Sequence, residues 1–168
     1  MVSSITLKNL IIGYRSKHQL RAIASPVHAS LQAGELTCLI GANGVGKSTL
    51  LRTLAGFQPA LDGDILIQDK SLSDFSAQEL AREISIVLTS KTDHAQLSAE
   101  EIVGIGRSPY TGFWGTLSAA DKQIVASALQ ETGIQHLAQR NISELSDGER
   151  QKVMIAKALA QQTRIIIL

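Results

Sequence analysis

Short apolar runs separated by polar turns dominate the chain, and they predict β-strands. The first two runs carry β-type patterns and are separated by a polar turn at residues 15–19. Asp62-Gly63 predicts a tight turn before another short strand, whereas three further runs are almost wholly apolar, as is typical of buried strands. The predicted strands cover residues 5–14, 27–31, 36–40, 64–68, 84–88 and 164–168.

Serines that are followed three residues later by an acid predict the starts of helices. In such a capping box the serine side chain accepts a hydrogen bond from the third helical N–H, and the acid accepts one from the serine N–H. The pairs are Ser76/Glu79, Ser98/Glu101, Ser118/Asp121 and Ser146/Glu149. Apolar residues at helical spacing follow Ser118, and Gly133 supplies a stop. Residues 98–140 are therefore expected to form a mainly helical insert between two strands of an α/β core.

A glycine-rich segment between a predicted strand and a predicted helix is a candidate phosphate-binding loop. It matches the phosphate-cradling pattern G-x-x-x-x-G-K-[S/T] and reads Gly41-Ala42-Asn43-Gly44-Val45-Gly46-Lys47-Ser48-Thr49. The glycines let several backbone N–H groups point into one concavity. Lys47 places a charge near the β- and γ-phosphates, and the Ser48 hydroxyl is an oxygen ligand for Mg²⁺. The helix expected at residues 49–55, ended by Gly56, would aim its positive end at the phosphates. The pattern predicts binding of a nucleoside triphosphate.

Composition and charge limit the other kinds of protein that this chain could be. With 168 residues, a net charge of +1 and no long run of Lys or Arg, the chain suits one globular domain without a nucleic-acid footprint. No stretch approaches the roughly 18 apolar residues of a membrane span, and no basic leader precedes the first apolar residues, so we expect a cytosolic location. Cys38 is expected to be a small buried hydrophobe. The histidines are scattered, which argues against a metal site made by His18, His28, His94 and His136.

A second motif lies far beyond the phosphate loop. It reads Leu145-Ser146-Asp147-Gly148-Glu149-Arg150-Gln151 and, taken alone, is only a helix cap. In combination with the phosphate loop it resembles the signature L-S-G-G-Q/E of the ATP-binding-cassette (ABC) ATPases. The resemblance covers essentially all of the chain, which is similar to the first two-thirds of such a domain. It implies an α/β P-loop NTPase fold, incomplete at the C-terminus, that binds ATP and Mg²⁺. The parts of that fold are a parallel core sheet, an N-terminal antiparallel β subdomain, and a helical subdomain of about residues 98–140 plus the helix at 146–161.

The resemblance also assigns roles to single residues. Tyr14 lies where the family places an aromatic that stacks on adenine, although an edge-strand aromatic has the same pattern. Thr89 stands where the family normally carries the glutamine that helps to place Mg²⁺ and water. Asp147 replaces the second signature glycine, and it adds negative charge near a γ-phosphate unless it points away. The segment Gly106-Arg107-Ser108-Pro109-Tyr110 resembles the helical lobe of importers of the iron-siderophore, haem and cobalamin type.

Partners follow from the same resemblance. Two cassettes face each other head to tail, and the signature of one closes over ATP held by the phosphate loop of the other, so a homodimer is expected. The signature residues are Leu145, Ser146, Asp147, Gly148 and Glu149. Membrane permease subunits would hold the dimer at the inner face of the cell membrane and connect it indirectly to a substrate-binding protein.

The family's catalytic residues are expected to lie beyond this sequence. In the family, an aspartate that holds Mg²⁺ and a glutamate that activates water follow the strand at residues 164–168. A histidine that contacts the γ-phosphate comes later still. The chain as it stands is therefore expected to bind nucleotide without hydrolysing it alone, and no catalytic residue is assigned in it.

The sequence leaves alternatives open. An ABC-type ATPase that acts on DNA or ribosomes carries the same core motifs, but it adds coiled-coil arms or a second cassette, and no sustained heptads follow Lys47 here. A non-catalytic nucleotide-binding fragment is the other alternative. Tyr110, Phe113 and Trp114 are expected either to form part of a docking surface for a membrane subunit or to make a small satellite core.

Overall fold

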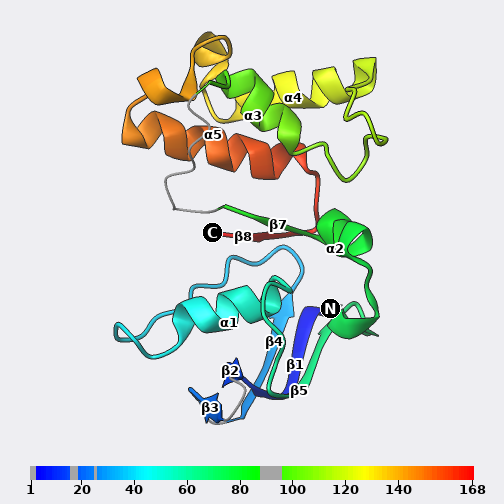
Figure 1. Ribbon diagram of the computed structural model, residues 1–168, viewed down its shortest axis with the longest axis vertical. Helices are drawn as coiled ribbons and strands as arrows, with labels where there is room; N and C mark the ends of the chain where they lie inside the picture. Colours follow the sequence, from blue (N-terminus) through cyan, green and yellow to red (C-terminus); the bar gives the residue numbers. More distant parts are fainter. Residues whose placement is uncertain (1–2, 16–18, 25, 88–95) are drawn as a thin grey trace. The chain divides into compact units, whose positions relative to one another are not determined.

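A computed structural model describes residues 3–15, 19–24, 26–87 and 96–168 of the chain (Figure 1). The chain divides into two compact units, Met1–Leu80 and Ala81–Leu168. Antiparallel strands dominate the first unit, and helices packed on one another dominate the second. Within the described ranges, no helix combines the length and apolarity needed to cross a membrane.

The first unit is built on a four-stranded sheet in the order β4-β1-β5-β6. Its strands are β1 (Ser3–Ile11), β4 (Val27–Gln32), β5 (Asp62–Ile67) and β6 (Lys70–Ser71). β1 pairs antiparallel with both β4 and β5. Across the β1–β5 pair Leu7 lies opposite Ile65, and both side chains are buried. Alternate residues of a strand point to one face, so such pairs give the sheet its apolar side.

A hairpin and a helix complete this unit around the phosphate loop. The hairpin consists of β2 (Gly13–Arg15) and β3 (Leu20–Ala22), and the Ile23 N–H extends its pairing to the Ile12 carbonyl (2.9 Å). Helix α1 (Lys47–Leu54) begins at the end of the loop. It stops before Gly56, whose φ of 74° ends the helix as predicted. A 3₁₀ turn, η1 (Leu72–Asp74), follows β6.

The strand predicted at residues 36–40 does not form. In the part of the chain that the structure describes, these residues belong to none of the sheets, and Leu36 and Ile40 are 87% and 90% exposed. Cys38, expected to be buried, is exposed as well. A short apolar run becomes a strand only where neighbouring strands complete its backbone hydrogen bonds, and none of the described strands pairs with residues 36–40. Apolarity alone therefore gave a wrong prediction here.

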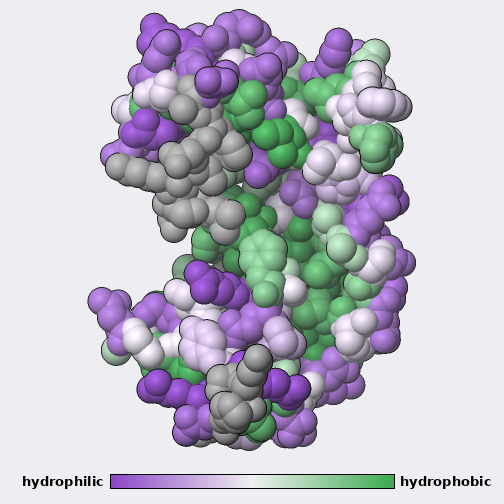
Figure 2. Space-filling view, viewed as in Figure 1, coloured by the Kyte–Doolittle hydropathy of each residue, from purple (hydrophilic) through white to green (hydrophobic). Residues whose placement is uncertain are grey.

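In the second unit, helices surround a common apolar core. Their bounds are α3 (Ala99–Ile105), α4 (Ala119–Glu131) and α5 (Asp147–Ala160), with 3₁₀ turns at η2 (Gln135–Leu137) and η3 (Ile142–Glu144). Val103, Val125 and Val153, one from each α-helix, are almost fully buried. On the face drawn in Figure 2, polar residues cover the outer margin of this unit, as expected when each helix turns its apolar side inward.

Two predicted strands pair with each other in the second unit. β7 (Ile84–Ile86) runs parallel to β8 (Ile165–Ile167), and the Val87 N–H extends the ladder to the Ile167 carbonyl (2.8 Å). Helix α2 (Ala77–Glu83) leads into β7. Parallel strands need a long connection, which α3, α4 and α5 supply. The α/β class predicted from the sequence is confirmed.

Each predicted capping box is present. Ser98, Ser118 and Ser146 are N-caps whose side chains accept from the third helical N–H, while the acid at that position accepts from the serine N–H. At the start of α2, Ser76 and Glu79 exchange the same two bonds, 2.7 and 3.2 Å long. The predicted helix starts are confirmed, including the one that uses an aspartate.

Candidate functional site

The phosphate loop enters α1 in a conformation that glycine adopts most readily. Gly44 and Gly46 have φ values of 82° and 106°, in the left-handed region. Gly46 is also the N-cap of α1, which has neither a capping side chain nor an acid in its first turn. The first N–H groups of α1 therefore face no competing carboxylate, and the helix dipole adds positive potential there. This combination favours an anion at the loop.

Lys47 is held over the loop by the loop's own backbone. Its Nζ donates to the Gly41 carbonyl (2.6 Å) and to the Ala42 carbonyl (2.8 Å). These bonds fold the side chain back, so that its charge lies beside the backbone of the loop. Neutral carbonyls are weaker partners for an ammonium than phosphate oxygens are, so an incoming phosphate can replace them.

The β2–β3 hairpin packs against the loop and α1. A Cβ added to Gly46 would lie 2.6 Å from Cγ2 of Ile23, so only glycine allows Ile23 this approach. The Tyr14 hydroxyl lies 3.2 Å from Oγ1 of Thr49 in the first turn of α1. The two contacts fix the hairpin beside the loop and leave Tyr14 half exposed.

A cavity of about 570 Å³ lies between the hairpin and the loop. The hairpin side contributes Tyr14, Arg21 and Ile23, and the loop side contributes most of residues 43–49. Among the described residues, the lining includes Lys47 and Arg21 but no acid. A cavity of this size holds a ligand as large as a nucleotide, and its charge suits an anionic one.

The predicted loop residues divide by position. Asn43, Gly44, Gly46, Lys47, Ser48 and Thr49 line the cavity. Gly41 and Ala42 instead support Lys47 through their carbonyls, and the Val45 N–H donates to the Ala42 carbonyl (3.4 Å). For Mg²⁺, Ser48 supplies one hard oxygen at the cavity wall. Mg²⁺ usually keeps several waters and takes phosphate oxygens as further ligands, so a single hydroxyl fits it in the presence of a nucleotide.

The signature residues start α5 in the second unit. Leu145 is buried, and Ser146 is the N-cap. Glu149 Oε2 accepts from the Ser146 N–H (2.8 Å) and from the Ser146 hydroxyl (2.7 Å). The side-chain bond from Ser146, followed by its backbone bond, lowers the pKa of Glu149. Glu149 is therefore an ionised capping residue at neutral pH.

The charge of Asp147 is paired within the same helix. Its carboxylate accepts a hydrogen bond from the Arg150 guanidinium one turn later. Next to it, Gly148 has open space where a side chain would be. The predicted concern that Asp147 adds unbalanced negative charge is thereby reduced, and the backbone of Gly148 stays accessible. Thr89, the remaining predicted position, lies outside the described residues.

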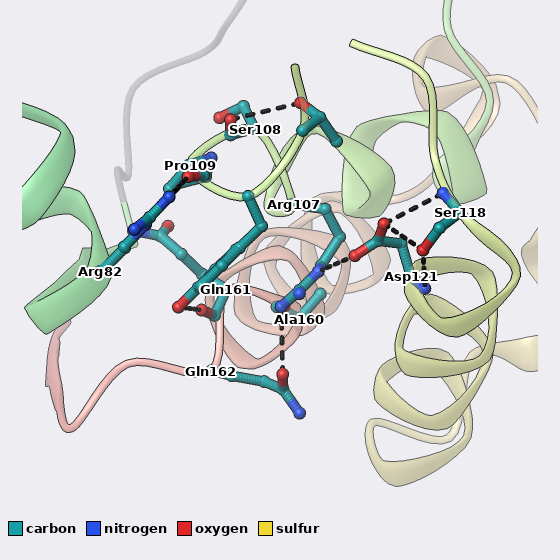
Figure 3. A network of polar contacts seen from close by, with 11 residues as sticks. Arg82, Arg107, Ser108, Pro109, Ser118, Asp121, Ala160, Gln161 and Gln162 are labelled. Atoms are coloured by element: carbon teal, nitrogen blue, oxygen red, sulfur yellow. Dashed lines mark hydrogen bonds and ion pairs between the residues drawn. The ribbon is translucent and has the colours of Figure 1, made fainter.

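A buried network around Arg107 was not predicted (Figure 3). The Arg107 guanidinium donates to Asp121 Oδ1 (2.8 Å) and to the Ala160 carbonyl (2.9 Å), and it lies 4.1 Å from the centre of the Tyr110 ring. The Tyr110 hydroxyl donates to the Gln161 carbonyl (3.0 Å). Arg107 thus ties the start of α4 to the end of the signature helix α5. In the sequence, the segment 106–110 carries only a family resemblance, and the partners of Arg107 are too distant along the chain to be inferred from it.

The aromatic residues that follow this segment separate into two kinds. Tyr110 belongs to the network and is 38% exposed. Phe113 and Trp114 are 96% and 87% exposed, and their rings meet edge to face, 5.4 Å apart. The satellite core expected as one possibility therefore does not form around Trp114.

Comparisons with known proteins agree on one family. A family profile described as "ABC transporter" matches residues 24–168. An uncharacterised ABC transporter ATP-binding protein of Haemophilus influenzae is 42% identical over 161 residues, which cover 96% of this chain and 60% of that protein. The iron(3+)-hydroxamate import ATP-binding protein FhuC of Bacillus subtilis is 35% identical over 167 residues, covering 99% of this chain and 61% of its own length.

A solved structure gives the same result in three dimensions. A putative metal-chelate type ABC transporter in an inward-facing conformation superimposes with a TM-score of 0.80 at 27% identity, covering 99% of this chain and 59% of that one. The chain thus spans about three-fifths of the length of the proteins it matches.

Proposed function

This chain belongs to the ABC transporter family, and we propose that it is the ATP-binding part of an importer subunit that energises uptake of an iron-siderophore, haem or cobalamin. The cavity lined by Tyr14, Arg21 and Lys47 carries the proposal. The cargo is suggested by a relative named for iron(3+)-hydroxamate import and by a structure titled as a metal-chelate transporter. Haem and cobalamin are included because the segment at residues 106–110 resembles importers of all three kinds.

Nucleotide binding uses the groups around the cavity. Lys47 exchanges its bonds to the neutral loop carbonyls for bonds to charged oxygens of the β- and γ-phosphates, which are stronger acceptors for an ammonium. The N–H groups at the start of α1 bind the same phosphates. The Tyr14 ring receives the adenine face. When bound through Ser48 and the phosphates, Mg²⁺ neutralises charge on the transferred phosphoryl group.

Neither acid of the signature is proposed as a catalytic base. Glu149 is occupied by two hydrogen bonds from Ser146, and Asp147 is paired with Arg150. A general base must be free to accept a proton from water within hydrogen-bond reach, and a lowered pKa makes Glu149 a poorer base still.

The signature is proposed to act on ATP held by a second cassette. Ser146 offers a hydroxyl, Gly148 an unhindered N–H, and α5 the positive end of a helix dipole, all of which suit a γ-phosphate. The pairing of Asp147 with Arg150 reduces the repulsion that its carboxylate would exert on that phosphate. A homodimer then contains two ATP sites, each completed by the partner.

The membrane connection belongs to the same proposal. Permease subunits bind the cassette dimer at the cytoplasmic face of the membrane, and a substrate-binding protein delivers cargo to them from outside. Phe113 and Trp114 fit a contact with such a subunit, because exposed aromatic pairs are enriched at interfaces. ATP hydrolysis in the dimer then drives transport.

The test is equilibrium titration of the purified protein with a fluorescent ATP analogue. Lys47→Ala is expected to weaken ATP and ADP binding about 10- to 100-fold, the loss that follows from removing one hydrogen bond to a charged group. Arg52→Ala is the matched control, because Arg52 is an exposed cation of the same helix outside the cavity. If Lys47→Ala binds like the parent while thermal melting shows both to be folded, the nucleotide site is assigned wrongly.

A further inference from the structure

We propose that Arg21 is a second phosphate-binding cation of this cavity and that it contacts the α-phosphate of the nucleotide. The inference rests on the proposed nucleotide-binding function and goes beyond it. It assigns a role to a residue outside the phosphate loop and distinguishes that role from those of Lys47 and Tyr14.

The register of the hairpin places Arg21 beside Tyr14. The two residues are directly opposite in the antiparallel β2–β3 pair, so their side chains leave the same face of the hairpin about 5 Å apart. The backbones are held close at this point, because a side chain at Gly13 would collide with the Arg21 carbonyl. Arg15, adjacent to Tyr14 in β2, leaves the opposite face.

The face that carries Arg21 is the one turned toward the phosphate loop. Ile23 lies two residues after Arg21 and therefore shares its face. The Ile23 side chain is the group that packs on Gly46 of the loop. Arg21, Ile23 and Tyr14 all line the cavity, whereas Arg15 does not. Ala22, between Arg21 and Ile23, also borders the cavity, so the lining itself is the observation that directs Arg21 toward the ligand.

The guanidinium of Arg21 is available for a ligand. Across the residues that the structure describes, no hydrogen bond or ion pair engages its side chain, while Lys47 is bonded to Gly41 and Ala42. None of the cavity-lining residues that the structure describes is an acid that could neutralise it. A planar guanidinium presents parallel N–H groups that match two oxygens of one phosphate. Arg21 is therefore an open cation on the wall of an anion-binding cavity.

Position along the nucleotide selects the α-phosphate. The proposed site holds the adenine on Tyr14 and the β- and γ-phosphates at Lys47. The α-phosphate lies between these parts in the covalent structure of ATP. Arg21 stands opposite Tyr14 on the hairpin, whereas Lys47 is bonded to carbonyls of the loop, so we assign Arg21 to the phosphate closest to the base.

The experiment compares adenosine, AMP, ADP and ATP as competitors of a fluorescent ATP analogue. Arg21→Gln is expected to weaken the binding of AMP, ADP and ATP by a similar factor, about tenfold, and to leave the binding of adenosine unchanged. Lys47→Ala should weaken the binding of ADP and ATP but leave that of AMP unchanged. Arg21→Lys keeps the charge without the fork and should fall between the parent and Arg21→Gln. Arg15→Gln is the matched control and should bind all four ligands as the parent does.

The outcomes separate this inference from the function on which it rests. If the parent fails to bind ATP, the proposed function is wrong. If the parent binds ATP and Arg21→Gln binds each of the four ligands as tightly as the parent does, Arg21 does not contact the phosphates and the inference is wrong. A loss that includes adenosine also overturns it, because the contact would then be with the base or ribose. Thermal melting should be the same for parent and Arg21→Gln, since no contact inside the described fold is lost.

Discussion

At the scale of single residues, Tyr14 combines two contributions that substitution can separate. Its ring lines the cavity, and its hydroxyl lies 3.2 Å from Oγ1 of Thr49. Tyr14→Ala removes both, and we expect the free energy of ATP binding to weaken by roughly 1–3 kcal/mol, the range for stacking of a base on an aromatic ring. Tyr14→Phe keeps the ring and should retain most of the affinity. Titration with a fluorescent ATP analogue measures both variants, and equal losses would contradict stacking as the cause.

Other residues show where reasoning from sequence reaches its limit. The loop pattern predicted that Lys47 and Ser48 lie at one site, and both line the cavity, because the residues of the motif are close in sequence and form one turn. Arg21 carries no local signal, since its proposed role follows from being paired opposite Tyr14 and from lining the same cavity as the phosphate loop. The pairing of Asp147 with Arg150 has the i,i+3 spacing of helix neighbours and could have been anticipated once the helix was assigned.

At the scale of elements, Arg107 joins the ends of two helices. It bonds Asp121 in the first turn of α4 and the Ala160 carbonyl at the end of α5. A lysine has one ammonium in place of a planar fork, so Arg107→Lys cannot keep both bonds in this geometry. We expect the free energy of unfolding to fall by about 1.5–3 kcal/mol, as for loss of a hydrogen bond to a charged group. Urea denaturation measures it, with the exposed Arg52→Lys as control, and an Arg107→Lys variant as stable as the parent would refute the role of the fork.

The cap of α4 also sets a pH dependence. Hydrogen bonding from the Ser118 side chain, followed by that from Arg107, lowers the pKa of Asp121 from 3.8 to about 2. The pKa is depressed in the folded state, so the stabilisation is present above the unfolded value and is lost as the pH falls from about 4 to about 2. Asp121→Asn lacks this titration. The difference in urea midpoint between parent and Asp121→Asn should therefore shrink over that range, and a difference that is constant with pH would contradict the cap as its origin.

Elements differ in how far their sequence determines them. The helix starts could be predicted, because a capping box joins residues three positions apart and needs nothing from the rest of the chain. The strand at residues 36–40 could not, because a strand depends on neighbours that supply its hydrogen bonds, and the apolar run gives no information about them. The Arg107 network could not be predicted either, because its contacts also join distant parts of the sequence: Ala160 is 53 residues away from Arg107.

At the scale of the whole molecule, the two halves of the proposed ATP site belong to different units. The cavity lies within Met1–Leu80, and the signature begins α5 in Ala81–Leu168. Binding at the cavity needs only one chain, whereas the proposed contact of the signature needs ATP on a second chain. The two events should therefore respond differently to protein concentration, because dimer formation follows mass action and binding within one chain does not.

Hydrogen exchange of backbone amides can separate these events. With ATP present, amides of the phosphate loop should gain protection at every protein concentration. Amides of residues 146–149 should gain it only at high concentration, where dimers form, in a pair of samples about a hundredfold apart. At an ATP concentration that only just saturates the parent, Lys47→Ala should strongly reduce both changes, since the signature closes only over bound nucleotide. If ATP protects residues 146–149 equally at both concentrations, ATP reaches the signature within one chain. The proposed contact of the signature with ATP on a second cassette is then wrong.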